Sequence, residues 1–514
     1  MSGSVIVIGA GLAGLSAGVY SRLNGYDSLI VEHHSQPGGV AAWWTRKDYL
    51  FDGGIHFLMG HRPGQPTYEL YEELGIFPGV RVVDMHAYAE YVDEASGRSV
   101  VVGSDIERLA DDLTGSLGAG VSPAASGRSR AGVHGDRAVV ARLVEEARSL
   151  RGVGFAAAGM ERPPELSRFY HTARDLWDMR GLLRHMHGSM GRPVAEFAAG
   201  IEDPWVRWVV RNLFMPDVPV WFVTMLLAML ADGQLGLLKD GCRSFVGAIE
   251  RRYLDLGGEV VYGATGEEIL VEHDRAVGVR LTDGTEHRAD AVISAADGRS
   301  TIFDMLRGRY VNDGIVRRYR DWRLFEPYVM VSFGVRRTFP GEPPLSAYRL
   351  EHPLSVGDRT VEGIMMRRFD YGDVFAPSGR AVIQVEFESD FEHWARLRRD
   401  RAAYKAEKQR VSEAVLDRLE RHYPGLGALV DVVDVATPYT TWRYTRNERG
   451  AFEGWMPVPE VMTRTLERTL PGLDGFFMAG QWVMPGGGVP PVLFSGRHAV
   501  QLMCSRDGRT FRRS

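Results

Sequence analysis

The feature that most constrains the fold is a glycine-rich turn near the start of the chain, placed between a strand pattern and a helix pattern. The β-branched run SVIVI, residues 4–8, predicts a short buried strand. Gly9, Gly11 and Gly14 follow in the spacing GxGxxG, and the next residues, LSAGVYSRLNG, have helical apolar spacing. A second predicted strand, DSLIVE, ends on Glu32. Strand, glycine turn, helix and acid in this order predict a Rossmann-type dinucleotide-binding unit.

Each part of this turn has a physical task at a dinucleotide. Gly9 permits the tight turn, Gly11 lets the backbone approach a pyrophosphate, and Gly14 lets the helix pack closely on the strand. The phosphates would lie at the positive end of the helix. Glu32 would accept hydrogen bonds from the hydroxyls of the adenosine ribose.

A glycine pair, Gly38 and Gly39, follows the acid in the run HHSQPGG. An acid followed closely by such a pair resembles the glutathione reductase-like and amine oxidase-like FAD proteins, in which this second turn packs beside the cofactor's phosphates. An NAD-dependent dehydrogenase has no reason to place a glycine pair there. The expected cofactor is therefore FAD.

A second glycine-rich run, AGQWVMPGGGVPPVLFSG, lies near the end of the chain. We expect Gly480 to turn beneath the cofactor, with Gln481 beside it. From Gly486 through Gly487 to Gly488 the backbone is expected to approach the isoalloxazine and ribityl chain, because glycine brings no Cβ. Val489 is expected to bind the cofactor as well. The two prolines that follow suit the first turn of a helix, whose positive end would favour the negative charge of a reduced flavin.

Composition bounds the class of protein. The chain has 514 residues, of which 45% are hydrophobic and 25% charged, which indicates a soluble globular protein of two or three domains. Its net charge of −5 argues against a nucleic-acid partner. The two cysteines lie in unrelated contexts, so we expect no metal site and a reducing, cytoplasmic compartment. The N-terminal residues do not have the pattern of a signal peptide.

Two stretches bear on contact with membranes. The longest apolar run, residues 218–231, is too short to span a bilayer. It predicts a buried helix, with a membrane-dipping or lipophilic-substrate surface as the alternative. The basic C-terminal run RDGRTFRRS is expected to be frayed and could touch an anionic membrane surface. Peripheral membrane association therefore stays open.

The predicted fold class is α/β. A discontinuous FAD-binding domain of the glutathione reductase/amine oxidase-like kind interleaves with an α+β substrate domain. We assign residues 1–100, 239–300 and 466–514 to the FAD-binding domain, and residues 101–238 and 301–465 to the substrate domain. The strand pattern DAVISAAD predicts a segment that returns to complete the Rossmann sheet. The Gly/Ser/Ala-rich stretch 118–135 predicts a loop.

Six segments together resemble the phytoene desaturase-like flavoproteins, the group of carotenoid desaturases, carotenoid cis–trans isomerases and retinol saturases. The segments are GAGLAGL, EHHSQPGG, YLFDGGIHFLMG, LKDGCRSF, DAVISAAD and MAGQWVMPGGGVPPVLFSG. The chain departs from the group at Gly266, where a valine is usual in a stretch whose backbone contacts adenine. The resemblance is weakest over the inserted residues that would define the substrate.

This resemblance implies that flavin N5 exchanges hydride with a carbon of a lipophilic substrate. His56, in FDGGIHF, is the first candidate catalytic residue, as a hydrogen-bond partner of the isoalloxazine or as a proton donor. Tyr444 is the second candidate proton donor, and Trp442 and Tyr444 are expected to line the substrate cavity. No second dinucleotide-binding unit is evident, so electrons would pass to or from oxygen, a quinone or a redox protein, or the net reaction would be an isomerisation.

Two other functions fit the same residues. An amine oxidase-like flavoenzyme would use the same FAD scaffold, although the apolar run at residues 218–231 argues mildly against it. A non-catalytic escort protein for a prenylated partner would keep the fold. The complete glycine turn, the glycine pair and the C-terminal glycine run argue that this chain holds its cofactor.

Overall fold

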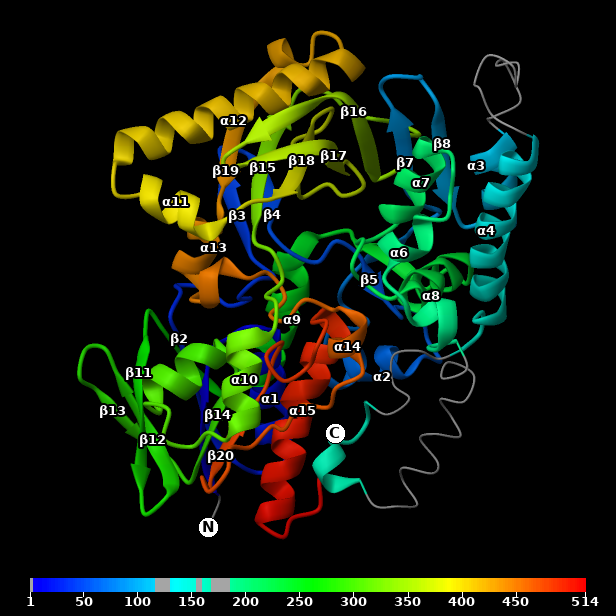
Figure 1. Ribbon diagram of the computed structural model, residues 1–514. Helices are drawn as coiled ribbons and strands as arrows, with labels where there is room; N and C mark the ends of the chain where they lie inside the picture. The colour runs from blue at the N-terminus through cyan, green and yellow to red at the C-terminus, as the bar shows by residue number, and fades with distance from the viewer. Residues whose placement is uncertain (1–2, 116–129, 154–159, 168–184) are drawn as a thin grey trace.

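The structure is a computed structural model that describes residues 3–115, 130–153, 160–167 and 185–514. A five-stranded sheet lies in the lower half of Figure 1 and a seven-stranded sheet in the upper half. Most of the loop predicted at residues 118–135 falls outside the described residues. Helix α4 (Arg130–Ser149) begins within the predicted loop, so the last residues of that stretch, 130–135, are helical.

The lower sheet is parallel throughout and is built from three distant parts of the chain. Its strands, in spatial order, are β10 (Glu259–Tyr262), β2 (Asp27–Glu32), β1 (Ser4–Ile8), β14 (Ala291–Ser294) and β20 (Phe476–Met478). β14, from the middle of the chain, lies between β1 and the last strand, β20. This order confirms the predicted fold class, a Rossmann-type unit completed by returning segments.

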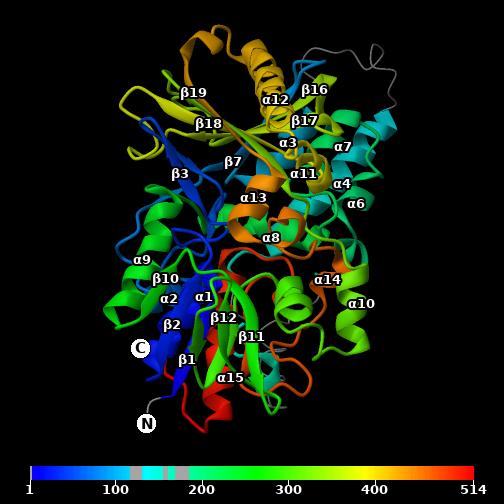
Figure 2. The same cartoon turned by 90° about the vertical axis from the view of Figure 1, so that its left-hand side faces the viewer.

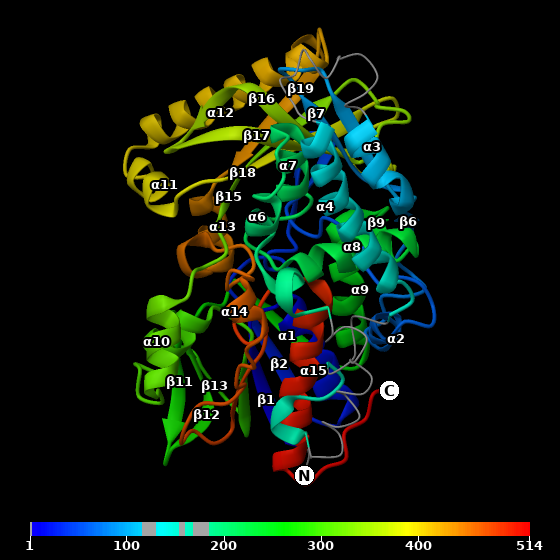
Figure 3. The ribbon, with the colours of Figure 1, turned by 45° about the vertical axis from the view of Figure 1, so that its right-hand side comes forward.

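Different layers cover the two faces of this sheet. The covering elements are α1 (Leu12–Leu23), α9 (Gly241–Asp255) and α15 (Val489–Arg506) on one face, and β11 (Gly266–Glu272), β12 (Arg275–Leu281) and β13 (Glu286–Arg288) on the other. Side chains alternate along a strand, so Val5 and Val7 pack against the helices and Ile6 and Ile8 against the small sheet. α15 runs beside α1, which joins the two ends of the chain (Figure 3).

The upper sheet has its own core. Its strands, in spatial order, are β19 (Val430–Ala436), β15 (Tyr328–Val335), β18 (Ala381–Glu388), β17 (Arg359–Phe369), β16 (Leu345–Val356), β7 (Ala87–Asp93) and β8 (Ser99–Gly103). Helix α12 (Arg401–His422) covers this sheet at the top of Figure 1, and its buried residues Val411, Val415 and Leu419 share a core with β15 and β18. Helix α13 (Pro438–Thr445) lies between the two large sheets (Figures 1 and 2).

The remaining elements connect these parts. The strands are β3 (Trp43–Arg46), β4 (Tyr49–Asp52), β5 (Leu58–Met59), β6 (Val82–Asp84) and β9 (Leu235–Leu238). The helices are α2 (Pro66–Glu73), α3 (Leu109–Gly115), α6 (Val194–Ala198), α7 (Pro204–Arg211), α8 (Val220–Ala231), α10 (Asp313–Asp321), α11 (Phe391–Leu397) and α14 (Pro459–Met462).

The strand pairing bears on the domain boundaries. β7 lies within the predicted FAD-binding segment 1–100, yet it pairs in parallel with β16 of the upper sheet. This pairing favours an end of the first segment before residue 87. The division into the two domains at the stated boundaries stays a prediction.

The apolar run at residues 218–231 forms α8, whose residues are mostly buried in a core shared with α4 and α7. The predicted buried helix is therefore confirmed. Across the described residues, no helix combines the length and the apolarity that a membrane span needs.

The C-terminal run is packed rather than frayed, so that prediction is wrong. Arg512 donates its backbone N–H to Asn24 Oδ1 at 2.7 Å, and the ring of Phe511 lies 5.6 Å from that of Tyr20 on α1. The Arg513 guanidinium pairs with Glu161. These contacts engage part of the basic run with the protein itself.

Candidate cofactor and active site

The first glycine turn is tight because its backbone groups contact one another. Gly9 has a φ of +99°, which favours glycine, and its N–H donates to the Val31 carbonyl oxygen at 2.8 Å. A Cβ on Gly14 would lie 1.8 Å from the Gly9 carbonyl oxygen. Helix α1 begins directly after Gly11 without a side-chain cap, so its first-turn N–H groups have no side-chain acceptor among the described residues.

The glycine pair lies against this first turn. The Gly38 N–H donates to the Ala10 carbonyl oxygen at 2.9 Å, and Gly38 forms an isolated bridge with Gly11. Gly38 and Gly39 have φ values of +119° and +59°. A Cβ on Gly39 would come within 3.3 Å of Gly11 Cα, so side chains here would fill the space between the two turns.

Glu32 is buried at the carboxyl end of β2, beside the glycine turn. Its carboxylate accepts hydrogen bonds from the backbone N–H groups of Ala10 at 2.6 Å and His34 at 2.7 Å. Burial raises the pKa of Glu32, while these two hydrogen bonds act in the opposite direction. The carboxylate is thus held in place by the turn, with further lone pairs open to a ligand.

Most of the predicted cofactor-binding residues line one pocket. Those that line it are Gly9, Gly11, Glu32, Gly38, Gly39, Gly480 and Gln481. Those that do not line it are Gly14, which packs inside the turn, and Gly487, Gly488 and Val489. Sequence reasoning missed several lining residues: Thr265, Ala295, Ala296 and Asn447. The small residues that end the pattern DAVISAAD were the available signal for two of them.

Gln481 ties the pocket to a loop from the upper half of the molecule. With its amide oriented to satisfy its neighbours, its oxygen accepts from the Gly454 N–H at 3.2 Å and from Asn447 Nδ2 at 3.1 Å. The preceding Gly480 has a φ of +97° and donates its N–H to Ser495 Oγ at 2.7 Å. The first part of the C-terminal run is therefore fixed from both sides.

The later glycines of the run lie against the same loop. Gly487 has a φ of +55°, and a Cβ there would lie 2.8 Å from Glu453 Cβ. Gly488, at a φ of +79°, is the N-cap of α15, which begins at Val489 and carries the two prolines in its first turn. The predicted start of this helix is confirmed, whereas the contact of these residues with a flavin stays a prediction.

Replacing Gly487 with valine is expected to abolish FAD retention or to shift the flavin potential. The new Cβ would collide with Glu453, and a β-branched residue is strained at positive φ. Bound FAD per chain and the reduction potential are the measurements. Gly472→Val is the control, because Gly472 has a φ of +75° but nothing within 4 Å of its Cβ position. Unchanged flavin content, potential and turnover would place the run away from the cofactor.

His56 belongs to a charged cluster on the upper side of the site. Its Nε2 lies 3.1 Å from a carboxylate oxygen of Glu386 on β18, and Glu386 also pairs with Arg367 on β17 at 3.2 Å. Burial alone would raise the pKa of Glu386, but the charges and hydrogen bonds of His56 and Arg367 lower it to about 2. The carboxylate is therefore ionised at neutral pH and holds the imidazole from one side. The ring of Phe452 stacks on His56 with centroids 6.1 Å apart.

A second buried acid, Asp52, extends this cluster toward α9. Its carboxylate accepts a hydrogen bond from the Cys242 N–H at 2.9 Å, and Gln384 Nε2 donates to the Asp52 carbonyl oxygen at 3.1 Å. Burial raises the pKa of Asp52 to about 6, although the Cys242 N–H and the charge of Arg367 act in the opposite direction. Asp52 connects two of the quoted motifs, FDGGIHF and KDGCRS.

Tyr444 and Trp442 on α13 do not join His56. Tyr444 is 43% exposed, lines the pocket that contains Glu32 and makes an edge contact with His34 at 4.8 Å. Trp442 packs against Tyr439 at 5.3 Å and lies under the Arg446 guanidinium at 4.6 Å. The structure thus places Tyr444 at the acid end of the pocket. The predicted roles of both residues at the substrate stay untested, and His56 is the candidate with a defined charged partner.

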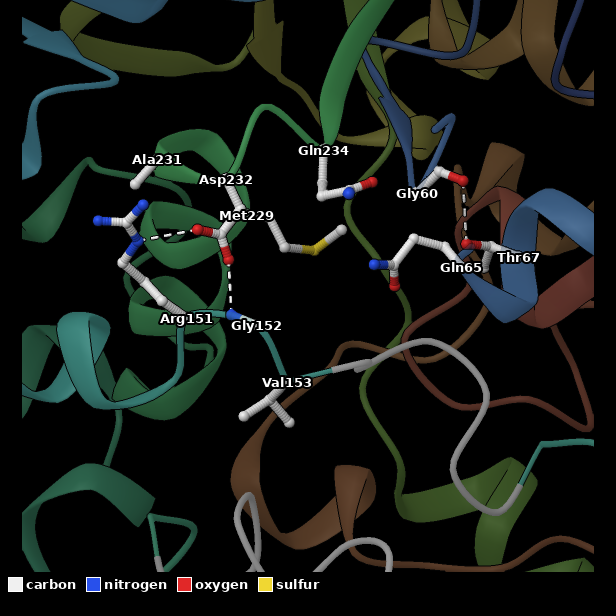
Figure 4. A pocket seen from close by; sticks show the side chains of 10 residues that line it. All are labelled: Gly60, Gln65, Thr67, Arg151, Gly152, Val153, Met229, Ala231, Asp232 and Gln234. Atoms are coloured by element: carbon white, nitrogen blue, oxygen red, sulfur yellow. Dashed lines mark hydrogen bonds and ion pairs between the residues drawn. The ribbon is translucent and has the colours of Figure 1, made fainter. Parts of the chain in front are cut away.

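A second cavity, of about 420 Å³, lies between α2 and α8 and was not predicted from the sequence (Figure 4). The side chains of Gln65, Met229 and Gln234 point toward one another across it. On one side Asp232 pairs with Arg151 at 2.8 Å and accepts the Gly152 N–H at 2.7 Å. Its lining is mixed polar and apolar.

Comparison with known proteins defines the family. The profile of the family described as flavin containing amine oxidoreductase matches residues 12–504. The chain belongs to this family. It is a flavin-dependent oxidoreductase, and its cofactor is FAD. The resemblance to the carotenoid desaturase group is confirmed by the curated relatives.

Two curated relatives align with nearly all of this chain. A chloroplastic prolycopene isomerase of Arabidopsis thaliana is 23% identical over 97% of this chain and 81% of its own length. A neurosporene-forming phytoene desaturase of Rhodobacter capsulatus is 24% identical over 98% of this chain and 94% of its own.

Solved structures support the fold of the family. An oxidoreductase of Methanosarcina mazei superposes with a TM-score of 0.60 at 16% identity, over 97% of this chain and 100% of its own. Cyclohexylamine oxidase of Brevibacterium oxydans superposes with a TM-score of 0.59 at 15% identity, over 99% and 100%. At these identities the likeness concerns the fold alone.

Proposed function

We propose that this flavin-dependent oxidoreductase acts on C–C and C=C bonds of a lipophilic, isoprenoid- or polyene-like substrate, by desaturation, saturation or isomerisation. Relatives named prolycopene isomerase and phytoene desaturase, aligned over almost the whole chain, support the substrate class. The escort function is not favoured, because the chain retains a complete nucleotide pocket.

The observation that carries the proposal is an apolar cluster directly beside the pocket. Val40 follows the glycine pair, lines the pocket and also packs against a cluster of buried apolar residues. The buried members are Phe325, Met330, Phe452 and Met456. Phe452 in turn stacks on His56. A lipophilic molecule beside the bound cofactor would meet this apolar cluster. A binding site for an amine would instead need a cage of polar or aromatic groups.

The residues of the pocket fit the dinucleotide part of FAD. The turns at Gly11 and Gly39 leave a space that side chains would fill, and the first-turn N–H groups of α1 suit phosphate oxygens. Glu32 would hold the ribose hydroxyls. Bound FAD supplies the hydride-transfer chemistry. His56, held by Glu386, would orient the ring system or the substrate beside it.

Electron partners belong to the same proposal. We expect oxygen, a quinone or a redox protein to exchange electrons with the flavin, unless the net reaction is an isomerisation. We also propose a cytoplasmic location, with or without peripheral membrane association.

The test is anaerobic mixing of the oxidised and the photoreduced enzyme with a panel of polyenes, sterols, polyketides and amines. We expect a polyene to change the flavin absorbance or to be converted to a product that separates by chromatography. Flavin reduction by amines alone, with every polyene recovered unchanged, would defeat the proposal in favour of an amine oxidase. A colourless protein that cannot be reconstituted with FAD would contradict the flavoenzyme assignment itself.

A further inference from the structure

Glu453 lies where the loop from the upper half crosses the C-terminal glycine run. Its Cδ would be 3.4 Å from a Cβ on Gly487, and its Cβ 2.8 Å from it. The next residue, Gly454, donates its N–H to the amide oxygen of Gln481. The residue after it, Trp455, donates its Nε1–H to the Trp482 carbonyl oxygen at 3.2 Å. The loop is thus fixed, and Glu453 is held against the glycine run by its neighbours rather than by its own charge.

The Glu453 carboxyl has no partner among the described residues. No hydrogen bond or ion pair is formed by it, although the residue is partly buried. Burial, acting alone, raises its pKa to about 7. The contrast with Glu386 is direct, because Glu386 is also buried but is paired with His56 and Arg367. Burying an unpaired carboxylate is costly, which is why the pKa of Glu453 lies above its ordinary value.

The groups around Glu453 belong to the apolar cluster and to the His56 side of the site. Phe452, its neighbour in the chain, contacts the rings of His56 and Tyr328. Burial raises the pKa of Tyr328, and the charges of four acids raise it further: Glu388, Glu386, Glu453 and Glu326. Glu453 therefore lies within electrostatic reach of Tyr328. The other titratable groups of this region are the paired His56, Glu326 just before β15, and Glu386 and Glu388 on β18.

We propose that Glu453 is the acid–base group of this enzyme, exchanging a proton with a substrate carbon that lies against Phe452 and the glycine run. The inference rests on the proposed function. In saturation, the proton would leave the Glu453 carboxyl and the π electron pair of the C=C bond would form one new C–H bond, while hydride from the reduced flavin would complete the adjacent carbon. In desaturation, the Glu453 carboxylate takes the proton from one carbon while hydride from the adjacent carbon goes to the oxidised flavin, and the electrons left behind form the C=C bond.

The first experiment needs no substrate. The absorbance of the bound oxidised flavin is titrated from pH 5 to pH 9 in the wild type, in Glu453→Gln and in Glu460→Gln. Glu460 is an exposed acid of α14 and serves as the matched control. We expect a one-proton transition near pH 7 in the wild type and the control, and its loss in Glu453→Gln. A transition that survives in Glu453→Gln would assign it to another group and overturn the proposal.

The second experiment uses a polyene that the wild type converts. Glu453→Gln should turn it over about 10²–10⁴-fold more slowly at equal FAD content, with partial recovery in Glu453→Asp. The incorporation of deuterium from heavy water into the product should fall together with the turnover. Equal turnover and equal deuterium uptake in Glu453→Gln would refute the role of Glu453 and leave the proposed function intact. A wild type that converts no polyene, but keeps the Glu453-dependent transition, would instead refute the substrate class alone.

Discussion

Gly14→Ala is expected to yield a protein that retains no FAD. The alanine Cβ would lie 1.8 Å from the Gly9 carbonyl oxygen and 3.0 Å from its carbon. Both atoms are backbone of the same turn, so α1 must move away from β1 to relieve the overlap. That movement takes the first-turn N–H groups of α1 away from the position that suits the phosphates. The measurement is the ratio of flavin to protein absorbance after gel filtration.

The control is Gly135→Ala in α4. A Cβ there would meet nothing within 4 Å, and alanine is favoured over glycine inside a helix by about 1 kcal/mol. Flavin content should therefore be unchanged in this variant, and its thermal midpoint should not fall. Full FAD occupancy in Gly14→Ala would mean that the turn tolerates the shift and that the close helix–strand contact is not needed for binding.

The second large effect is expected at Arg367. This buried guanidinium pairs with Glu386 at 3.2 Å, donates to Gln384 Oε1 at 3.1 Å and lies over the ring of Phe369. Arg367→Met leaves the Glu386 carboxylate buried with His56 as its remaining partner. Removal of one member of a buried pair costs about 3–5 kcal/mol in the free energy of unfolding. Urea unfolding of the FAD-saturated protein at pH 7 measures the loss.

Two further variants test the cause. Arg367→Met combined with Glu386→Gln should recover most of the lost stability, because the uncompensated charge is gone. Arg359→Met removes an arginine of the same strand whose side chain is 34% exposed, so it should cost about 0–1 kcal/mol. Equal losses in Arg359→Met and Arg367→Met would show that burial of the pair is not the cause.

The dependence of the stability on acidic pH follows from the same pair of Glu386 and Arg367. The pKa of Glu386 in the folded protein lies near 2, below its ordinary value of 4.5. Its contribution to stability is therefore complete above pH 4.5 and is lost as the pH falls from there toward 2. In Arg367→Met the folded pKa of Glu386 rises, so this acid-dependent loss should become smaller.

The parts that the sequence predicted best are those encoded within a few residues. The run from Ser4 to Glu32 contains strand, turn, helix and acid in order, and a local pattern suffices to predict a local structure. Pairing between distant strands leaves no such pattern. β7 reads as a strand wherever it lies, and only its pairing with β16, more than two hundred residues later, places it in the upper sheet.

The charged groups of the site show the same limit. His56 was found because its motif resembles a known one, but its partner Glu386 lies on a strand with no distinguishing motif. Glu453 was missed because its contact with Gly487 joins two segments that no local pattern links. An acid between the apolar residues of AFEGWM was the available signal. Tyr444 was expected beside the substrate; α13 places it at the acid end of the pocket, and its role at the substrate stays a prediction.

The parallel sheet has a consequence for the order in which the protein matures. β1 borders β14, and β14 borders β20, whose strand begins at Phe476. Gly480 and Gln481, which line the same pocket as the first glycine turn, follow shortly after β20. A ribosome must therefore translate almost the whole message before the pocket can close. Flavin binding is thus a late event in biogenesis. A chain truncated before Phe476 should bind no FAD and should be colourless.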